Sequence, residues 1–489
     1  MKKNIIVFVL ALIMMPMLAG AQALKGSYFL ENSLNGHQMN PAFAPRANYF
    51  QLLPIANMGV GTYTNLDMKT FLYPVSSGKL GTFLHPEVSV QQFDRALPNH
   101  PHLDADVNAN IFSFGFYNKK KAFWNFEIDA RVNVDVDLPR DLFFFLKKGT
   151  GLEGDSFNVG NINAYAMAGV QASLGYSREF VKGLRTGIKV RAIAPVAYGA
   201  LNLENVRLNT TQEQWTVETE GYLHAVMHGL DISMPGPDAQ LPDVSFDLNK
   251  LLANKVLAGI GYSVDLGVRY TLEVGSVFDG LTLSASVTDL GQIFYKSEAI
   301  SSFESHGQMA WNGVNLENTF DIENPFDILK EEAMALLNLT EIENTGEDMV
   351  RSTMPTVYAG VELPFLRRKM SVGLLYSARF SHSYVREELT ASYNLKPAKW
   401  IALGVNYSFL NTGSTVGGIF EFTPKAGPTF YLGCDYFPYQ FAPLPFDGID
   451  LGDLQFGSLP IPMSWRFNLN YGIAFNLGSK HVNPKKNKR

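Results

Sequence analysis

Several long segments of this chain alternate apolar and polar residues with a period of two. Two of the clearest are Ser464–Gly478 (SWRFNLNYGIAFNLG) and Trp124–Leu138 (WNFEIDARVNVDVDL). Successive side chains of a strand point to opposite faces, so each segment predicts a strand with one apolar face and one polar face. Strands of soluble sheets are commonly about five or six residues long, whereas a strand that crosses a bilayer at a slant needs roughly nine to eleven. The length of these segments therefore favours membrane-spanning strands over a soluble β-sandwich.

The same alternation recurs along the chain. It is found in Ala166–Tyr176, Leu184–Ala192, Ala258–Leu272, Leu281–Leu290, Met370–Phe380 and Ile401–Phe409. Short polar links (117–122, 179–184, 275–280, 364–369, 395–399 and 423–427) alternate with links that include the long ones 139–163, 199–255, 295–350 and 438–463. Bacterial outer-membrane barrels alternate short periplasmic turns with longer outer loops in this way.

We therefore predict an all-β chain that forms a single transmembrane antiparallel barrel of about fourteen strands, within a range of about twelve to sixteen. The strands are expected to begin near residues 49, 109, 122, 164, 184, 256, 281, 351, 370, 386, 400, 417, 428 and 465. The segment Leu201–His228 also has β character. We interpret it as a hairpin within an outer loop, and the count becomes sixteen if it supplies two wall strands.

The two ends of the chain carry export and tail signals. Lys2 and Lys3 precede an apolar run from Ile5 to Met15, and Ala19-Gly20-Ala21 is a small-x-small cleavage site. These features predict a signal peptide over residues 1–21, with export to the outer membrane of a Gram-negative bacterium. Residues 22–48 precede the barrel, which we expect over 49–478, and 479–489 form a basic periplasmic tail.

Composition excludes some classes of function. The formal net charge of −6 among 489 residues leaves no basic surface of the kind that binds nucleic acid. The single cysteine, Cys434, allows no internal disulfide. No apolar run after the signal peptide is long enough for a transmembrane helix, so export leaves a soluble protein or a barrel.

A short motif lies between the signal peptide and the first strand. Asn40-Pro41-Ala42 resembles the NPA motif near the mature N-terminus of FadL-type outer-membrane proteins, and barrels of the PorV type share a similar signature. The longer run NGHQMNPAFAP (35–45) and SVTDLG (286–291) resemble a related family of exported barrels with no assigned function. The resemblance implies that residues 22–48 fold into the barrel as a plug and that hydrophobic molecules enter from outside.

Charged residues of both signs occupy the polar faces of the predicted strands. We expect a lumen-facing set in which carboxylates meet basic groups as cross-strand ion pairs, contacts with a plug, or a selective polar path. The acidic members are Glu127, Asp129, Asp135, Asp137, Asp265 and Glu273, and the basic members are Arg131, Arg185, Lys189, Arg191, Arg269, Arg379 and Arg466.

Other candidate chemistry is weak. His100, His102, Asp104 and Asp106 are interpreted as part of a polar outer loop, with a metal site as the alternative. His224 and His228 would share a face only in a helix, and their surroundings are as easily β. The chain has no G-x-S-x-G elbow and no phosphate-binding loop, so we predict no enzyme, metal or cofactor.

Two outer loops carry further expectations. Asn324 and Pro325 predict the start of a helix that runs from Phe326 to Leu337, either packed on the rim or acting as a plug or lid. The loop 436–462 is rich in Phe, Leu and Pro. It either folds against the rim or binds a hydrophobic ligand or partner.

Two functions remain open from the sequence. The first is a FadL-like barrel in outer-membrane lipid that binds or passes small hydrophobic molecules. The second is an interaction barrel of the PorV type, a shuttle or anchor whose partners are the secretion machinery or exported proteins.

Overall fold

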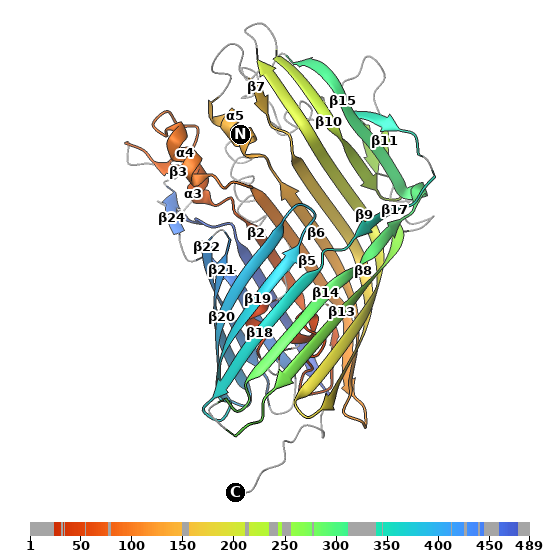
Figure 1. Ribbon diagram of the computed structural model, residues 1–489, viewed down its shortest axis with the longest axis vertical. Helices are drawn as coiled ribbons and strands as arrows, with labels where there is room; N and C mark the ends of the chain where they lie inside the picture. The colour runs from red at the N-terminus through yellow and green to blue at the C-terminus, as the bar shows by residue number, and fades with distance from the viewer. Residues whose placement is uncertain are drawn as a thin grey trace, which may run out of the picture.

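The chain forms one closed antiparallel β-barrel (Figure 1). The computed structural model describes residues 24–30, 33, 35–53, 55–76, 80–148, 156–210, 215–233, 243–246, 256–275, 278–311, 339–344, 346–411, 413–424, 428–438, 441–444 and 459–477. Within them, fourteen wall strands can be followed around the barrel. The expected signal peptide, the basic tail and the helix Phe326–Leu337 lie outside the described residues.

The wall strands follow one another in chain order. They are β1 (Tyr49–Leu52) continued by β2 (Met58–Thr64), β5 (His102–Tyr117), β6 (Phe123–Asp137), β8 (Ile162–Val181), β9 (Leu184–Thr210), β13 (Gly259–Thr271), β14 (Thr282–Tyr295), β17 (Met349–Ser352) continued by β18 (Thr356–Phe365), β19 (Met370–Phe380), β20 (Val385–Ala398), β21 (Ile401–Leu410), β22 (Gly413–Phe422), β23 (Pro428–Phe437) and β26 (Phe467–Asn476).

The last wall strand closes the barrel on the first. β26 pairs with β23 on one side and with β1 and β2 on the other, with Tyr49 opposite Asn476 and Met58 opposite Tyr471. Closure leaves the wall without an unpaired strand edge, which is what a β-structure requires inside a bilayer.

The strand positions predicted from the alternation are confirmed closely, with one clear error. His102, Asp104 and Asp106 do not lie in an outer loop, because β5 begins at His102. Their side chains are buried, while the intervening Leu103 is exposed. The inward face of this strand carries charged groups that are uncommon in soluble strands, which made the segment resemble a loop.

The two ends of the barrel differ, as predicted. At one end, which we call the turn end, short connections join β5 to β6, β8 to β9, β13 to β14, β18 to β19, β20 to β21 and β22 to β23. The opposite end, the loop end, carries the long connections (Figure 1).

β9 has 27 residues in all, and its later part continues beyond the wall at the loop end. Its upper part pairs with β10 (Trp215–Val226), which pairs with β15 (Ile300–Trp311), and β15 pairs with β16 (Leu339–Ile342). These strands form an outer sheet above the wall (Figure 1). The described part of 201–228 therefore forms a hairpin beyond the wall at the loop end and does not supply two wall strands.

Smaller elements complete the loop end. A cluster of apolar side chains (Leu66, Tyr73, Val88, Phe93, Leu97 and Phe143) holds together elements of the connections on either side of β5 and β6. The elements of the loop end are α3 (Met68–Phe71), β3 (Leu72–Pro74), β4 (Leu80–Thr82), α4 (Val90–Ala96), α5 (Arg140–Lys148), β7 (Ser156–Asn158), β11 (Leu230–Ser233), β12 (Asp243–Phe246), η2 (Ser297–Ala299), β24 (Phe441–Leu444) and β25 (Leu459–Pro462). Among the described residues, no helix is long and apolar enough to cross a membrane.

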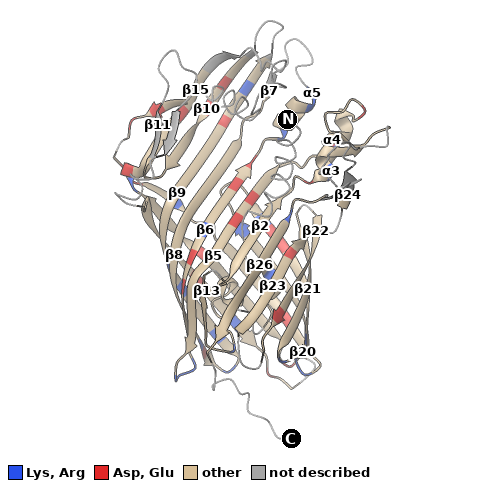
Figure 2. Cartoon of the chain, turned by 180° about the vertical axis from the view of Figure 1, so that it is seen from behind, with Lys and Arg blue, Asp and Glu red and all other residues tan. Residues whose placement is uncertain are grey.

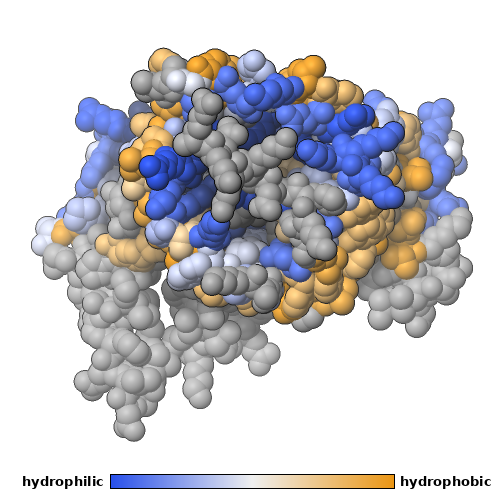
Figure 3. Space-filling model, turned by 90° about the horizontal axis from the view of Figure 1, so that it is seen from below, coloured by the Kyte–Doolittle hydropathy of each residue, from blue (hydrophilic) through white to orange (hydrophobic). Residues whose placement is uncertain are grey.

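The outer face of the wall is apolar. On β13, Ile260 and Leu266 are 62% and 47% exposed, whereas Ser263 and Asp265 on the opposite face are fully buried. In the view from the turn end, hydrophobic side chains lie along the flanks and hydrophilic ones gather over the end itself (Figure 3). Side chains as apolar as these are favourable on the outside of a protein only when lipid covers them.

A charge on this outer face should therefore destabilise the barrel. We expect Leu266→Arg to lower the free energy of folding into lipid vesicles by about 2–4 kcal/mol, since an arginine near the bilayer midplane costs that much in other barrels. Urea titration in lipid vesicles measures the change. The matched control is Glu273→Arg, in the exposed turn that follows β13. An equal effect of both substitutions would contradict a lipid-facing position for Leu266.

Candidate functional site: the lumen and its inner segment

The described residues between 24 and 48 lie inside the barrel. We call residues 24–48 the inner segment; its described residues include η1 (Lys25–Ser27) and α2 (Gly36–Met39). Tyr28, Met39 and Asn40 are at most 2% exposed. The segment contacts inward-facing groups of strands on several sides of the wall, as its three anchoring points show.

The first anchor lies at η1. The backbone nitrogens of Lys25 and Gly26 donate to the Asp435 carboxylate at 2.5 and 2.8 Å. The Lys25 ammonium forms an ion pair with Glu388 and donates to the Tyr436 hydroxyl. One buried cation and two backbone donors are thus matched by two buried carboxylates, as burial of charge requires.

The second anchor is aromatic. The ring of Tyr28 packs edge-on against Phe29 and Phe43 at centroid distances of 4.9 and 4.8 Å, and stacks on Tyr358 of β18 at 6.2 Å. A glycine of the wall leaves space for these rings, because a Cβ added at Gly373 would lie 2.4 Å from the Phe29 ring.

The third anchor is the Asn40-Pro41-Ala42 motif. The Asn40 amide nitrogen lies 3.3 Å from the carbonyl oxygens of Val268 and Ala285, and its oxygen accepts from the Ala42 nitrogen at 2.9 Å. Two glycines of the wall make room, since an added Cβ at Gly267 would lie 2.1 Å from Oδ1 of Asn40. At Gly187 it would lie 2.1 Å from the Pro41 oxygen.

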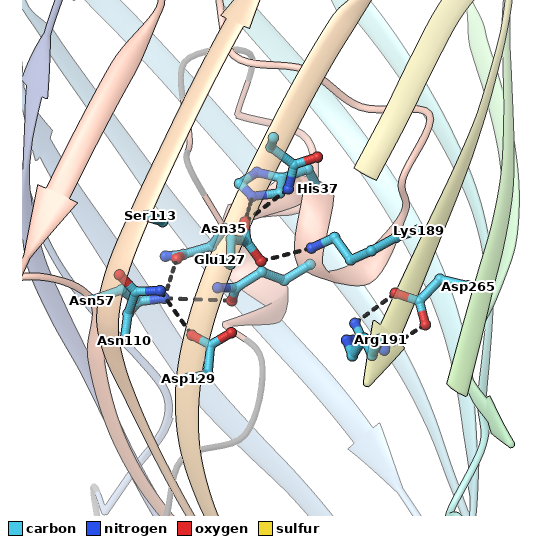
Figure 4. A network of polar contacts seen from close by, with 12 residues as sticks. Asn35, His37, Asn57, Asn110, Ser113, Glu127, Asp129, Lys189, Arg191 and Asp265 are labelled. Atoms are coloured by element: carbon cyan, nitrogen blue, oxygen red, sulfur yellow. Dashed lines mark hydrogen bonds and ion pairs between the residues drawn. The ribbon is translucent and has the colours of Figure 1, made fainter. Parts of the chain in front are cut away.

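Beside this motif, Glu127 is the centre of a buried polar network (Figure 4). Its carboxylate is hydrogen-bonded to the His37 ring of the inner segment and forms an ion pair with Lys189 of β9 at 2.8 Å. Asn125 donates to the same carboxylate at 3.0 Å. All four side chains are buried, and Glu127 joins the wall to the inner segment through a charge-assisted hydrogen bond with His37.

A second network lies on the wall nearby. Arg191 binds both oxygens of Asp265 at 2.5 Å each and also contacts Asp289 at 2.6 Å (Figure 4 shows the Arg191–Asp265 pair). Arg131 reaches Asp289 at 3.3 Å. Charges of both signs recur along the wall strands (Figure 2), and here they neutralise one another across four strands.

Towards the loop end, two arginines are held by β5. Arg379 binds both oxygens of Asp106 at 2.8 and 2.9 Å, and Arg386 binds Asp104 at 3.0 Å. Arg466, another member of the expected lumen set, pairs with Asp67 at 3.0 Å. Sequence reasoning placed Arg379 and Arg466 in the lumen but missed Arg386 and Asp67. It had interpreted Asp104 and Asp106 as part of an outer loop.

The remaining members of the expected set have separate environments. Asp129 accepts from Asn110 at 2.8 Å, and Asp135 is buried. The Arg269 guanidinium lies 5.6 Å from the ring centroid of Phe43 in the inner segment. Arg185 lies over the Tyr117 ring and donates to Ser177, and Asp137 is partly buried on β6.

Glu273 was placed wrongly in the lumen. It follows the end of β13 in an exposed turn and pairs with Lys182 at 2.5 Å, with 46% and 80% of the two side chains exposed. The alternation of β13 ends at Thr271, so the parity of the strand no longer applies at position 273.

Metal chemistry finds no support in the described residues, where no group of three or more His, Cys, Asp or Glu side chains could hold an ion. His224 lies on strand β10 and not on a helix, and its Nδ1 lies 2.9 Å from the Ser302 hydroxyl.

The inner segment leaves a cavity of about 150 Å³ in the lumen. Its lining combines the ion-paired groups described above with aromatic and apolar side chains, among them Tyr165, Tyr198, Tyr295, Ile193 and Met354. A space of this size holds a molecule about as large as benzene. The lining can therefore receive a small molecule with an apolar body and has charged groups available for a polar end.

Comparison with known proteins places the chain in a family. A family model matches residues 41–435, from within the N-terminal motif to β23. The chain belongs to the family of unknown function DUF5723. The match spans the described barrel from the inner segment to the thirteenth wall strand. A search of curated proteins found no match.

Solved structures with similar chains include FadL-type proteins. The deltaS2S3 mutant of TodX, described as a monoaromatic hydrocarbon channel, aligns with 11% identity and a TM-score of 0.39, covering 94% of this chain and 99% of that chain. The toluene transporter TodX of Pseudomonas putida aligns with 9% identity and a TM-score of 0.36, covering 94% and 95%. A FadL homologue of Pseudomonas aeruginosa aligns with 11% identity and a TM-score of 0.34, covering 94% of this chain and 97% of that chain.

Similarity at this level is too low to assign a substrate to this member of DUF5723, which must be sought in its own residues.

Proposed function

We propose that this DUF5723 protein is an outer-membrane barrel that passes small hydrophobic molecules, and that its inner segment is a plug. The observation that carries the proposal is the inner segment itself, bound to the lumen at three anchors and leaving a small mixed apolar and polar cavity. The apolar outer face supports a place in lipid. A barrel filled in this way would not act as an open, water-filled pore.

Uptake by cells tests this proposal. A strain that lacks the protein should take up toluene and other small apolar probes more slowly than the parent strain. Restoring the full chain should restore the rate, because entry would depend on the lumen. Unchanged uptake of every apolar probe in the deletion strain would count against passage.

Deleting residues 24–47 tests the role of the inner segment. Without it, the Asp435, Glu388 and Glu127 carboxylates lose their partners from the segment and the lumen is no longer filled. We expect selective uptake of apolar probes to be lost and ion conductance in planar bilayers to rise. A gel with and without boiling establishes that the variant is still a folded barrel. A folded variant with unchanged conductance and uptake would contradict the plug.

A second candidate function is protein interaction, and the outer sheet favours it. β9, β10 and β15 extend beyond the wall and present charged side chains to solvent, including the exposed pair Arg207 and Glu218. A shuttle or anchor for exported proteins would use such a surface. Cross-linking from residue 207 in living cells should then capture one exported protein repeatedly, and capture of none would leave passage as the function.

A further inference from the structure

One cation that lines the lumen cavity differs from the others. Lys25, Arg131, Arg379 and Arg386 also line it, and each is paired with a carboxylate. Arg351, on β17, lines the same cavity and has no acidic partner among the described residues. A half-buried guanidinium without a carboxylate beside it is available to bind an anion in the cavity.

Aromatic rings surround Arg351. Tyr165 stacks on His382 at a centroid distance of 4.3 Å with the planes 18° apart, and Tyr198 stacks on Tyr295 at 4.8 Å and 27°. All four side chains line the cavity with Arg351. They come from β8, β9, β14 and the link between β19 and β20, so the rings approach from different parts of the wall.

The Tyr198 hydroxyl is a second buried polar group at this place. Tyr198 is only 6% exposed, and its hydroxyl makes no hydrogen bond of standard geometry among the described residues, although the Arg351 guanidinium lies close enough for a weak one. Buried hydroxyls are normally satisfied, and leaving one without a partner costs free energy. Here the hydroxyl and the Arg351 guanidinium line one cavity.

The aromatic side chains around Arg351 pack on a buried apolar cluster. Ile193, Tyr198, Ala200, Ile293 and Tyr295 belong to one buried apolar cluster, with Tyr165 and Met349 packed against it. Arg351 is opposite Ile293 in the pairing of β14 with β17, so the same cluster fixes its backbone. The described residues therefore hold the site in a preformed arrangement.

We propose that Arg351 and the surrounding rings of Tyr165, Tyr198, Tyr295 and His382 form a binding site for a small aromatic carboxylate. The guanidinium would bind the carboxylate, the Tyr198 hydroxyl would donate to it, and the ring of the ligand would pack against the aromatic pairs. A volume of about 150 Å³ suits a single ring and is too small for a long acyl chain. This inference rests on the proposed passage of small apolar molecules and specifies the class that the protein would select.

Calorimetry on the purified full-length chain in detergent tests the site, with benzoate as the probe. Benzoate should bind, and Arg351→Met should weaken it by about ten- to a hundred-fold, because a hydrogen-bonded charge pair is lost. Tyr198→Phe should weaken it by about threefold to tenfold. Arg207→Met removes a cation of the outer sheet, outside the cavity, and should leave the affinity unchanged. Heat-modifiable migration on a gel establishes that each variant is folded.

Three further probes separate charge from shape. Benzyl alcohol keeps the ring without the charge, while cyclohexanecarboxylate and octanoate keep the charge without the aromatic ring. All three should bind more weakly than benzoate. Equal affinity for benzyl alcohol, equal affinity for octanoate, or an unchanged affinity in folded Arg351→Met would overturn the site. Uptake of toluene reports on passage separately, since Arg351→Met should leave it unaltered.

Discussion

Glu127→Gln should lower the free energy of unfolding by about 3–5 kcal/mol, the usual cost of removing one partner from a buried ion pair. The substitution keeps the shape of the side chain but removes its charge. Lys189, which is 1% exposed, then loses the carboxylate with which it forms its ion pair, and His37 loses the carboxylate that contacts its ring nitrogen. Urea titration in lipid vesicles, followed by tryptophan fluorescence and by migration on a gel without boiling, measures the change.

The same variant should also loosen the inner segment. Glu127 is the wall residue that the segment reaches through His37, so its neutralisation weakens a link between the two. Trypsin should cleave after Lys25 faster in Glu127→Gln than in the unaltered protein, because release exposes this otherwise buried lysine. Resistance to trypsin equal to that of the unaltered protein would show that the segment is held without this network.

A matched pair of controls isolates the charge. The double variant Glu127→Gln, Lys189→Met removes both members of the pair and should recover most of the lost stability, since replacing a whole buried pair is often close to neutral. Glu273→Gln breaks the exposed pair with Lys182 at the turn end and should leave stability unchanged, because exposed pairs contribute little. If the double variant is as unstable as Glu127→Gln, the loss is one of packing.

The alternation of the sequence predicted the wall because the fold imposes it at every strand. Lipid outside and a filled lumen inside require one apolar and one polar face, and a single residue of slippage would invert both. Long strands repeat this requirement many times, so the positions of fourteen strands could be predicted from local pattern alone. The same pattern cannot say which acid meets which base across the lumen, because those contacts join residues far apart in the chain.

Asp289 shows where the period fails. On β14, Thr282, Ser284, Ser286 and Thr288 are buried, so strict alternation would turn Asp289 outward. The pairing with β13 shifts register near this point, and Asp289 adopts a positive φ of 57° with its nitrogen donating to Asp265. Its carboxylate thereby binds Arg191 inside the barrel. A bulge of this kind changes which positions face inward, and no two-residue pattern predicts it.

Arg351 was missed for a related reason. β17 has only four residues, and Thr353-Met354-Pro355 separates it from β18, so there is too little alternation to assign a face. The inner segment has no repeating pattern either. Its contacts depend on wall glycines that lie more than a hundred residues away in the sequence. Gly187 and Gly267 appear in the sequence only as small residues of their strands, whereas the structure shows what their missing side chains admit.

Gly267→Val should displace the inner segment and open the lumen. Valine suits a strand, so the wall can accept it, but its Cβ would lie 2.1 Å from Asn40 and 2.9 Å from Pro41. Overpacking of this kind costs about 1–3 kcal/mol, which here opposes docking of the Asn40-Pro41-Ala42 motif. Because each 1.4 kcal/mol is about tenfold in an equilibrium, the undocked fraction should rise about five- to a hundred-fold.

Single-channel conductance in planar bilayers measures the opening, since ions can pass only where the lumen is no longer filled. Gly187→Val, which meets the Pro41 backbone from the neighbouring strand, should act in the same direction. Gly199→Val is the matched control, because a Cβ there meets nothing within 4 Å among the described residues. Conductance of folded Gly267→Val equal to that of Gly199→Val would mean that the motif does not close the lumen. A rise in conductance in Gly267→Val and Gly187→Val, and not in the control, would show that the contact of the Asn40-Pro41-Ala42 motif with these two glycines closes the lumen.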